Sequence, residues 1–283
     1  MRDSTNVGVE SLEQRRMLSA GGPGGGAVAY PPHAHVRGES VAELSAEWWS
    51  RVFETPVHAP DGTTITHPLM TSADTTSVGG LDGVSVLYGS FFGGTVNRTA
   101  TIPTGTPIFV PVLPVEFSNY DTSNADGSLP GTYSVAELRD LAAQAAEPVF
   151  EPGGNVYVRV DGKPVSDVAS HRVVSPEFDY VLPEDNVDQY FFGNESLVGP
   201  VPVAVADGFY VLLKPLSPGE HTVEFGGATA GGSLGPLGID VTYTVDVVPK
   251  GQYRKEQAAP SPAARVFVDT LVRKASRVAD GLL

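Results

Sequence analysis

The chain has 283 residues, enough for one large all-β domain or two small domains. Its formal net charge of −15 argues against nucleic acid as a partner, because a phosphate binder needs a positive surface, but it would suit bound cations. With no cysteine, disulfides, thiolate metal sites and cysteine catalysis are excluded. No apolar run approaches the length of a transmembrane segment.

Glycine and proline are frequent, with 32 and 24 residues, and long helical stretches are few. We assign this excess to turns between many short strands. The sequence therefore predicts a mainly β protein, an antiparallel β-sandwich of jelly-roll or immunoglobulin-like type with two short packing helices and a C-terminal amphipathic helix. Three segments are expected: a flexible N-terminal segment at 1–37, the β-sandwich domain at 38–249, and a linker with the amphipathic helix at 250–283.

The N-terminal segment carries a motif-like stretch and a Gly/Pro-rich connection. Residues 12–18, LEQRRML, resemble the LEPR-XLL motif found near the N termini of exported or surface proteins of some bacteria. Gln14 replaces the proline of that motif, and Met17 replaces a leucine. The resemblance implies a targeting or processing segment and an extracytoplasmic location. The alternative is a disordered tail that matches by chance.

A capping box predicts the first helix, because Ser40 can cap a free N–H while Glu43 reaches back to the serine. This helix should end before Pro56. Its apolar face carries Trp48 and Trp49, which we expect to pack against the sandwich, although two tryptophans could also form a platform for sugar stacking.

Ser134 and Glu137 form a second capping box, and the helix that follows should run through Glu147. Near the C terminus, apolar residues at 264–282 fall on one helical stripe with basic residues elsewhere. Such a helix could lie on a membrane surface or a partner, or dock on its own acidic domain.

The strands are expected at 84–92, 95–102, 107–115, 156–160, 171–174, 178–182, 209–213, 221–225 and 239–248. Turn residues at 93–94, at 161–162 and at 217–219 predict hairpins. The stretch 209–213 is apolar at nearly every position, which is typical of a strand that is covered on both faces.

Residues 98–112, RTATIPTGTPIFVPV, resemble a recurring segment of uncharacterised bacterial secreted proteins. The likeness extends loosely from Trp48 to about Val248. It implies one contiguous domain and an extracytoplasmic location, and it implies no chemistry.

The sequence contains no phosphate-binding loop, no HExxH and no GxSxG. Three weaker candidate sites are present. The first is an oxygen-rich loop with Asp121, Asn124 and Asp126, which could bind Ca²⁺, although its spacing fails the EF-hand template and Asx residues also mark turns. The second groups His58, His67 and Asp74, which could bind Zn²⁺ or act as acid and base, or could be ordinary surface residues.

The third candidate places carboxylates beside aromatic rings, a combination that holds sugars and could also cleave a glycosidic bond. Its carboxylates and its aromatic rings are Glu184, Asp185, Asp188, Tyr190, Phe191 and Phe192. Core packing of the aromatic rings is the alternative.

These observations favour an exported, non-enzymatic surface or binding module whose partner is a carbohydrate or a cell-envelope component, with Ca²⁺ or no cofactor. A hydrolase that uses His58, His67 and Asp74, or Glu184 and Asp185, is the rival interpretation, and a structural envelope component is the third. The hydrolase requires His67 and Asp74 to converge in a pocket, whereas the binding module requires exposed aromatic rings or a shallow groove.

Overall fold

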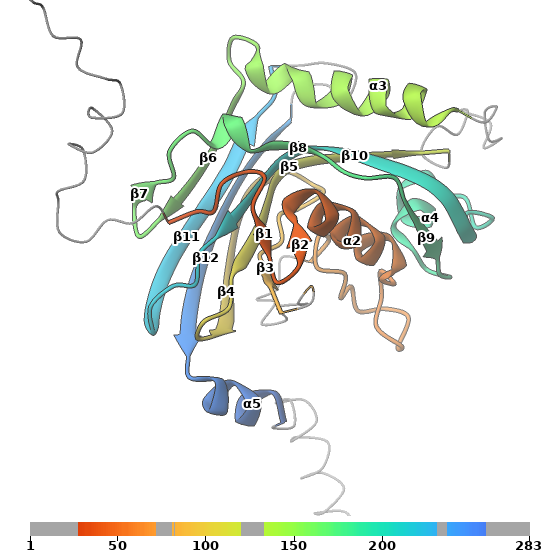
Figure 1. Ribbon diagram of the computed structural model, residues 1–283. Coiled ribbons are helices and arrows are strands. Elements are labelled where there is room, and N and C mark those ends of the chain that lie inside the picture. The colour runs from red at the N-terminus through yellow and green to blue at the C-terminus, as the bar shows by residue number, and fades with distance from the viewer. Residues whose placement is uncertain (1–27, 72–80, 82, 120–132, 231–236, 259–283) are drawn as a thin grey trace, which may run out of the picture.

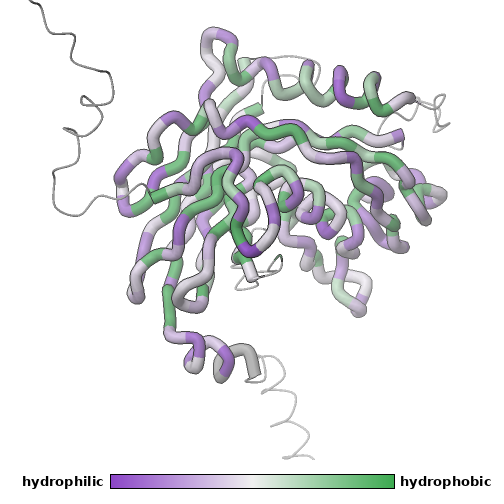
Figure 2. The backbone as a smooth tube through the Cα atoms, viewed as in Figure 1, coloured by the Kyte–Doolittle hydropathy of each residue, from purple (hydrophilic) through white to green (hydrophobic). Residues whose placement is uncertain are grey.

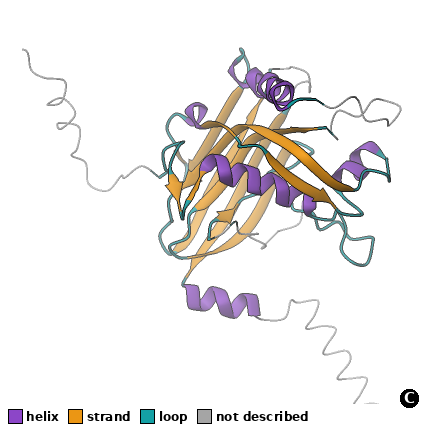
Figure 3. Cartoon of the chain, turned by 45° about the vertical axis from the view of Figure 1, so that its right-hand side comes forward, coloured by secondary structure: helices purple, strands orange, loops and turns teal. Residues whose placement is uncertain are grey.

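The computed structural model describes residues 28–71, 81, 83–119, 133–230 and 237–258. These residues are mainly β, as predicted, and they form two five-stranded sheets and a short ribbon (Figures 1 and 3). The predicted N-terminal motif and the C-terminal stripe at 264–282 lie outside the described residues.

The first sheet has the order β3-β5-β10-β8, and β9 also pairs with β10. The second sheet has the order β4-β12-β11-β6-β7. The strands of the first sheet are β3 (Ser85–Val86), β5 (Ile108–Ser118), β8 (Arg172–Val174), β9 (Phe178–Leu182) and β10 (Gly199–Leu213). Those of the second are β4 (Gly94–Pro103), β6 (Asn155–Val160), β7 (Lys163–Pro164), β11 (Gly219–Ala228) and β12 (Gly238–Val248).

Both predicted capping boxes are present and start α2 (Val41–Glu54) and α3 (Val135–Ala146). Helix α4 (Val187–Phe192) follows β9, and α5 (Lys250–Ala258) occupies part of the stretch that we expected to be a linker. Short 3₁₀ turns η1 (Glu147–Phe150) and η2 (Val168–His171) complete the helical elements of the described chain. None of the described helices is long and apolar enough to cross a membrane.

Strand β10 is covered on both faces, as its composition predicts. All residues from Ala204 to Leu213 are buried. Tyr210 packs into the same cluster as helix α2, whereas Phe209 and Val211 point the other way and pack against the second sheet. Val205 lies under α3. Figure 2 shows the hydrophobic residues concentrated along these central strands, whereas α5 is largely hydrophilic.

The predicted hairpin at 217–219 is wrong, because its two strands belong to different sheets. β10 lies in the first sheet and β11 in the second, so the turn crosses between layers. The turn at 93–94 likewise joins β3 to β4 without pairing them, and only two residues of the expected strand 84–92 enter a ladder. Turn chemistry fixes a local change of direction and does not choose the pairing partner. A hairpin does form at 161–162, but β6 pairs there with the short β7 and not with the expected strand 171–174, which forms β8 in the first sheet.

The sheets are mixed rather than purely antiparallel. β3 runs parallel to β5, and β4 runs parallel to β12 along its whole length. Because the chain switches layers between β4 and β5, and again between β10 and β11, neighbours within one sheet come from distant parts of the sequence.

The described residues begin at Val28, within the stretch 1–37 that we expected to be a flexible segment, and residues 28–30 contact the end of β10. The Tyr30 N–H donates to the carbonyl of Leu212 at 2.8 Å, and the Lys214 N–H donates to the carbonyl of Val28 at 2.8 Å. Strands β1 (His35–Val36) and β2 (Glu39–Ser40) then pair with each other. Residues 28–30 satisfy main-chain groups at the end of β10, where β8 no longer reaches.

An ion pair between the half-buried Arg172 and the buried Asp207 joins β8 to β10. The guanidinium of Arg172 contacts both carboxylate oxygens of Asp207 at 2.9 Å, and a third nitrogen contacts Glu147 at 2.7 Å. The Asp207 side chain is 4% exposed. The carboxylates of Asp207 and Glu147 raise the pKa of Arg172 by hydrogen bonding, against the opposing effect of burial. Arg172 therefore balances the negative charge of Asp207 within β10, the strand whose two faces pack against α2 and against the second sheet.

We expect Arg172→Met to lower the free energy of unfolding by about 3 kcal/mol, because it leaves the Asp207 carboxylate buried and unpaired. The control is Arg159→Met, which removes an exposed guanidinium that lies over Tyr157 and should change the free energy by about 0.5 kcal/mol or less. Urea unfolding measures both values. Equal, small losses in the two variants would show that Asp207 does not need its partner.

Candidate binding site: an aromatic surface beside an acidic cavity

Helix α4 is short but is fixed at both ends. The Asn186 side chain accepts a hydrogen bond from the Gln189 N–H at 2.9 Å, and the Gln189 side chain accepts from the Asn186 N–H at 3.2 Å. The Asn186 amide also donates to the carbonyl of Leu197 at 2.7 Å. Gly193 ends the helix in the left-handed conformation, with φ of 62°. The side chains of α4 are therefore held on a rigid support.

Four aromatic rings on and beside α4 face solvent, and we call them the aromatic surface: Phe92, Tyr190, Phe191 and Phe192. They are 46–56% exposed, so they are not core residues. The Phe191 ring centroid lies 5.5 Å from that of Tyr190, 5.9 Å from that of Phe92 and 5.5 Å from that of the partly buried Phe91. Phe191 thus joins Tyr190 and Phe92 into one exposed apolar patch, and such a patch is typical of an interaction site.

The loop below the aromatic surface is anchored by a buried arginine. Arg98, 2% exposed, donates to the carbonyls of Pro68 at 2.8 Å and Thr71 at 2.9 Å. In the same loop, the carbonyl of Leu69 accepts from the Phe91 N–H at 3.0 Å. Strand β4, which carries Arg98, thereby fixes the main chain at Phe91, the ring on which Phe191 rests.

A cavity of about 530 Å³ adjoins the aromatic surface at Tyr190. Its lining consists of His58, Glu184, Asp185, Gln189, Tyr190, Glu195 and Val198. Gln189 is engaged by main-chain groups, since its side-chain amide donates to the carbonyl of Glu195 at 2.9 Å while its oxygen accepts from the Asp185 N–H at 2.7 Å. The exposed carboxylates of Glu184 and Glu195 give the cavity its acidic character.

Asp185 holds His58 in place in this cavity. The His58 Nδ1 lies 2.7 Å from Asp185 Oδ1, and the His58 main-chain N–H donates to Asp185 Oδ2 at 2.8 Å. Because Nδ1 faces a carboxylate, we place its proton there. Asp185 has a φ of 61°, the left-handed region that Asp tolerates better than most residues. The sequence did not predict this pair, whose members are 127 residues apart.

His67 does not join His58, because it is fully buried and both of its ring nitrogens contact the main chain. Nε2 donates to the carbonyl of Val52, in the last turn of α2, at 3.0 Å, and Nδ1 accepts from the Leu69 N–H at 3.3 Å. Burial lowers the pKa of His67, which favours the neutral ring. Asp74, its expected partner, lies outside the described residues.

The remaining candidate residues divide between buried and undescribed positions. Asp188 is 4% exposed in the first turn of α4, so it is not presented to solvent with the aromatic surface. The calcium candidates Asp121, Asn124 and Asp126 lie outside the described residues. Within the described part of the chain, no group of three or more His, Asp or Glu side chains is arranged to hold a metal ion.

A Ser–His–Asp series that the sequence analysis missed lies at the start of β11. The His221 Nδ1 is 2.8 Å from Asp161 Oδ2, and its Nε2 is 3.2 Å from Ser217 Oγ. The same Nε2 lies 2.9 Å from the Ser217 carbonyl, so both ring nitrogens face acceptors and the ring does not act as a base for the serine. Burial alone would lower the pKa of His221, but hydrogen bonds to Asp161 and the Ser217 carbonyl raise it.

Comparison with known proteins gives no match: no protein-family model, no curated protein and no solved structure is similar to the chain at a significant level. The resemblances of residues 12–18 and 98–112 therefore stay predictions from the sequence.

We expect the His221 contact to stabilise the fold below about pH 6.5 and to lose its effect as the pH rises through the raised folded-state pKa. His221→Asn should thus lower the free energy of unfolding by up to about 1 kcal/mol at about pH 6, and by less at about pH 9. Asp161→Asn should weaken the same pH dependence, because only the Ser217 carbonyl would then still raise the pKa of His221. An equal loss at both pH values would show that the charge on His221 is irrelevant.

Proposed function

We propose that the chain is an exported, non-enzymatic binding module with a β-sandwich frame, and that its ligand is a carbohydrate. The sandwich frame is supported by the core cluster that the two sheets share, with Phe209 on one side and Phe225 on the other. Export is supported by the motif-like stretch at 12–18. The observation that carries the ligand class is the position of Tyr190, which belongs both to the aromatic surface and to the acidic cavity.

This combination matches the two faces of a pyranose ring. The C–H groups of a sugar form an apolar face that can stack on an aromatic ring. Its hydroxyl groups can donate hydrogen bonds to carboxylates. Tyr190 and Phe191 offer exposed ring faces, and Glu184 and Glu195 offer acceptors within the adjoining cavity. The site therefore serves both requirements from neighbouring positions.

The charge of the site narrows the class of sugar. Glu184, Asp185 and Glu195 contribute carboxylates, and only His58 among the lining residues can offset them. Uronic acids and sulfated sugars would be repelled, because like charges across an interface cost free energy. We therefore assign neutral hexoses and amino sugars as ligands.

The rigidity of α4 supports binding without rearrangement. The reciprocal bonds of Asn186 and Gln189, and the left-handed Gly193, hold the aromatic side chains at a fixed helix. A preformed site loses less conformational entropy on association than a flexible loop does.

Tyr190→Ala is expected to weaken binding of a neutral or amino-sugar oligosaccharide by roughly 5- to 30-fold, because the loss of one stacking face corresponds to about 1–2 kcal/mol. Glycan arrays identify the ligand, and titration calorimetry measures the affinity. The matched control is Phe150→Ala, which removes a ring that is 50% exposed and lies in η1, directly after α3 and outside the aromatic surface.

If the wild-type protein bound no glycan on the arrays, the proposal of a carbohydrate ligand would be rejected, and a structural role in the cell envelope would be the remaining interpretation. An equal loss of affinity in Tyr190→Ala and Phe150→Ala would show that the sugar does not bind at the aromatic surface.

Hydrolysis is the second candidate, and the His58–Asp185 pair favours it because both residues share the cavity with Glu184 and Glu195. Prolonged incubation with the bound oligosaccharide, followed by mass spectrometry, separates the two functions. The binding module predicts intact oligosaccharide. A hydrolase would release shorter products, and Glu184→Gln or Glu195→Gln would then stop the release while binding persisted.

A further inference from the structure

The apolar patch that contains the aromatic surface continues beyond its four rings. Leu237, 40% exposed, lies beside Gly93, since its Cδ1 is 3.5 Å from the position that a Cβ on Gly93 would take. On the other side, Val198, 39% exposed, lines the acidic cavity together with Tyr190. Exposed aliphatic side chains therefore flank the rings on two sides.

The rings are spaced like the successive turns of a helix. The Phe191 ring centroid lies 5.9 Å from that of Phe92 and 5.5 Å from that of Tyr190. The pitch of an α-helix is about 5.4 Å, which is the separation of side chains one turn apart on its apolar face. Amphipathic helices bind apolar surfaces through such side chains, so the spacing suits the apolar face of a helix.

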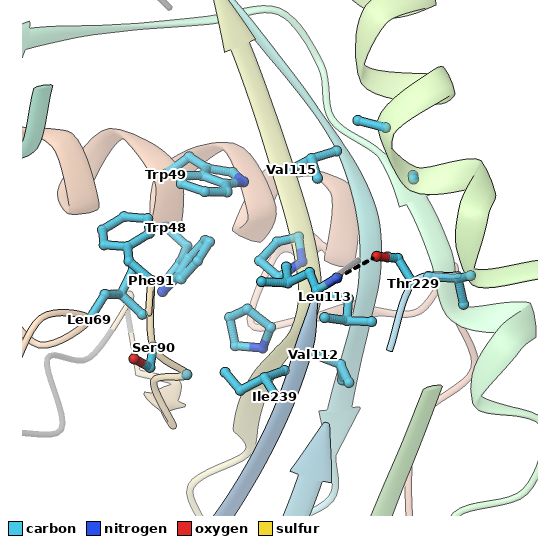
Figure 4. A pocket seen from close by; sticks show the side chains of 17 residues that line it. Trp48, Trp49, Leu69, Ser90, Phe91, Val112, Leu113, Val115, Thr229 and Ile239 are labelled. Carbon is cyan, nitrogen blue, oxygen red and sulfur yellow. Dashed lines mark hydrogen bonds between the residues drawn. The ribbon is translucent and has the colours of Figure 1, made fainter. Parts of the chain in front are cut away.

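Phe91 fixes the aromatic surface to the core. Its ring supports Phe191 and packs against the core cluster that contains Trp48 and Leu69. Figure 4 shows Phe91 beside these two side chains, at a small apolar cavity that all three line. The aromatic surface is therefore preformed, and a helix that docks there does not have to order it first.

The sequence contains a segment with the matching pattern. Residues 264–282, outside the described residues, carry an apolar stripe with helical spacing: Ala264, Phe267, Leu271, Ala275, Val278 and Leu282. At about 100° per residue, Lys274 and Arg277 fall along one side of this stripe, and we call them the basic margin. Asp269 and Asp280 fall on the opposite face of the same helix. An apolar stripe with a basic margin is complementary to an aromatic surface that adjoins an acidic cavity.

We propose that residues 264–282 form a helix that docks on the aromatic surface of the same chain. Its apolar stripe covers the rings of Tyr190 and Phe191, and its basic margin lies at the carboxylates of Glu184 and Glu195. The docked helix would then compete with a sugar for the same surface, a regulatory consequence that rests on the proposed function, whereas the docking itself does not.

The segment is long enough to reach this surface. Gly94 pairs with Ile239 at the start of β12, so Phe92 lies near that end, whereas α5 follows the other end. The 11 residues of β12 span about 36 Å. Residues 259–263 extend over up to about 17 Å, and a helix at 264–282 adds about 28 Å, which together exceed the length of β12. Figure 1 shows α5 running from the end of β12 toward the side of the view on which α4 lies.

A tethered segment is favoured over a second copy of the chain or a separate partner. Covalent linkage gives the segment an effective concentration on the order of millimolar, which a separate partner would have to exceed. A second copy would bring another acidic cavity, and two chains with a formal net charge of −15 repel each other.

The absence of cysteine makes a direct test possible, because a spin label attached through Ser276→Cys goes to one position only. Ser276 falls on the face of the helix away from the apolar stripe, so the label should not disturb the contact. In uniformly ¹⁵N-labelled full-length protein, the label should broaden the main-chain N–H signals of Phe191 and Phe192. The signal of Lys163 in β7, on the opposite side of the domain in Figure 1, should stay sharp.

Reversing the basic margin should release the segment. Lys274→Glu combined with Arg277→Glu should lower the ratio of docked to free segment by roughly tenfold, because two attractions become repulsions, and the broadening at Phe191 should fade. The matched control is Lys250→Glu combined with Arg254→Glu, which makes the same change in charge at exposed positions of α5 and should leave the broadening intact.

A charge swap tests the contact with the acidic cavity. Adding Glu184→Lys and Glu195→Lys to the variant with the reversed margin should restore the broadening, because the opposite charges face each other again. A segment held by the apolar stripe alone would not respond to this exchange. Failure of the swap to restore the broadening would therefore overturn the proposed orientation of the helix.

Three further outcomes would overturn the proposal. They are no broadening in the wild-type sequence, equal broadening at Lys163, and broadening that persists when the margin is reversed. A mixture of spin-labelled protein without ¹⁵N and ¹⁵N-labelled protein without the spin label should show no broadening, and broadening there would make a second copy the occupant.

The docking and the sugar site can fail separately. Broadening together with blank glycan arrays would support the docking and reject the sugar. Sugar binding without broadening would overturn the docking and leave the proposed function standing. If both hold, the variant with the reversed margin should bind the oligosaccharide several-fold more tightly than the wild-type protein does.

Discussion

The burial of β10 on both faces is the constraint on which the other layers depend. A strand with apolar side chains in both directions cannot lie at the surface of a two-layer protein, so each face needs its own cover. Helix α2 covers the face with Tyr210, and the second sheet together with α3 covers the face with Phe209 and Val205. Asp207 interrupts this apolar run, and Arg172 makes its burial tolerable.

The candidate binding site lies where this layered arrangement ends. Helix α4 follows β9, the short strand that pairs with the first half of β10, and it carries the aromatic surface away from the core. The aromatic surface therefore rests on a strand that β10 holds in register, while its own side chains stay exposed. A rigid sheet that presents side chains at its accessible edge is well suited to ligand binding.

Sequence patterns that involve only neighbouring residues predicted the structure correctly, whereas predictions that depended on a distant pairing partner did not. The capping boxes at Ser40 and Ser134 started helices as predicted, because a cap involves residues three positions apart. The hairpin at 217–219 failed because the turn is local whereas the choice of sheet depends on the whole core. The contact between His58 and Asp185 could not be predicted for the same reason, because the two residues are 127 positions apart. The exposure of the rings on α4 could not be decided either, because periodicity does not show whether another element covers a short helix.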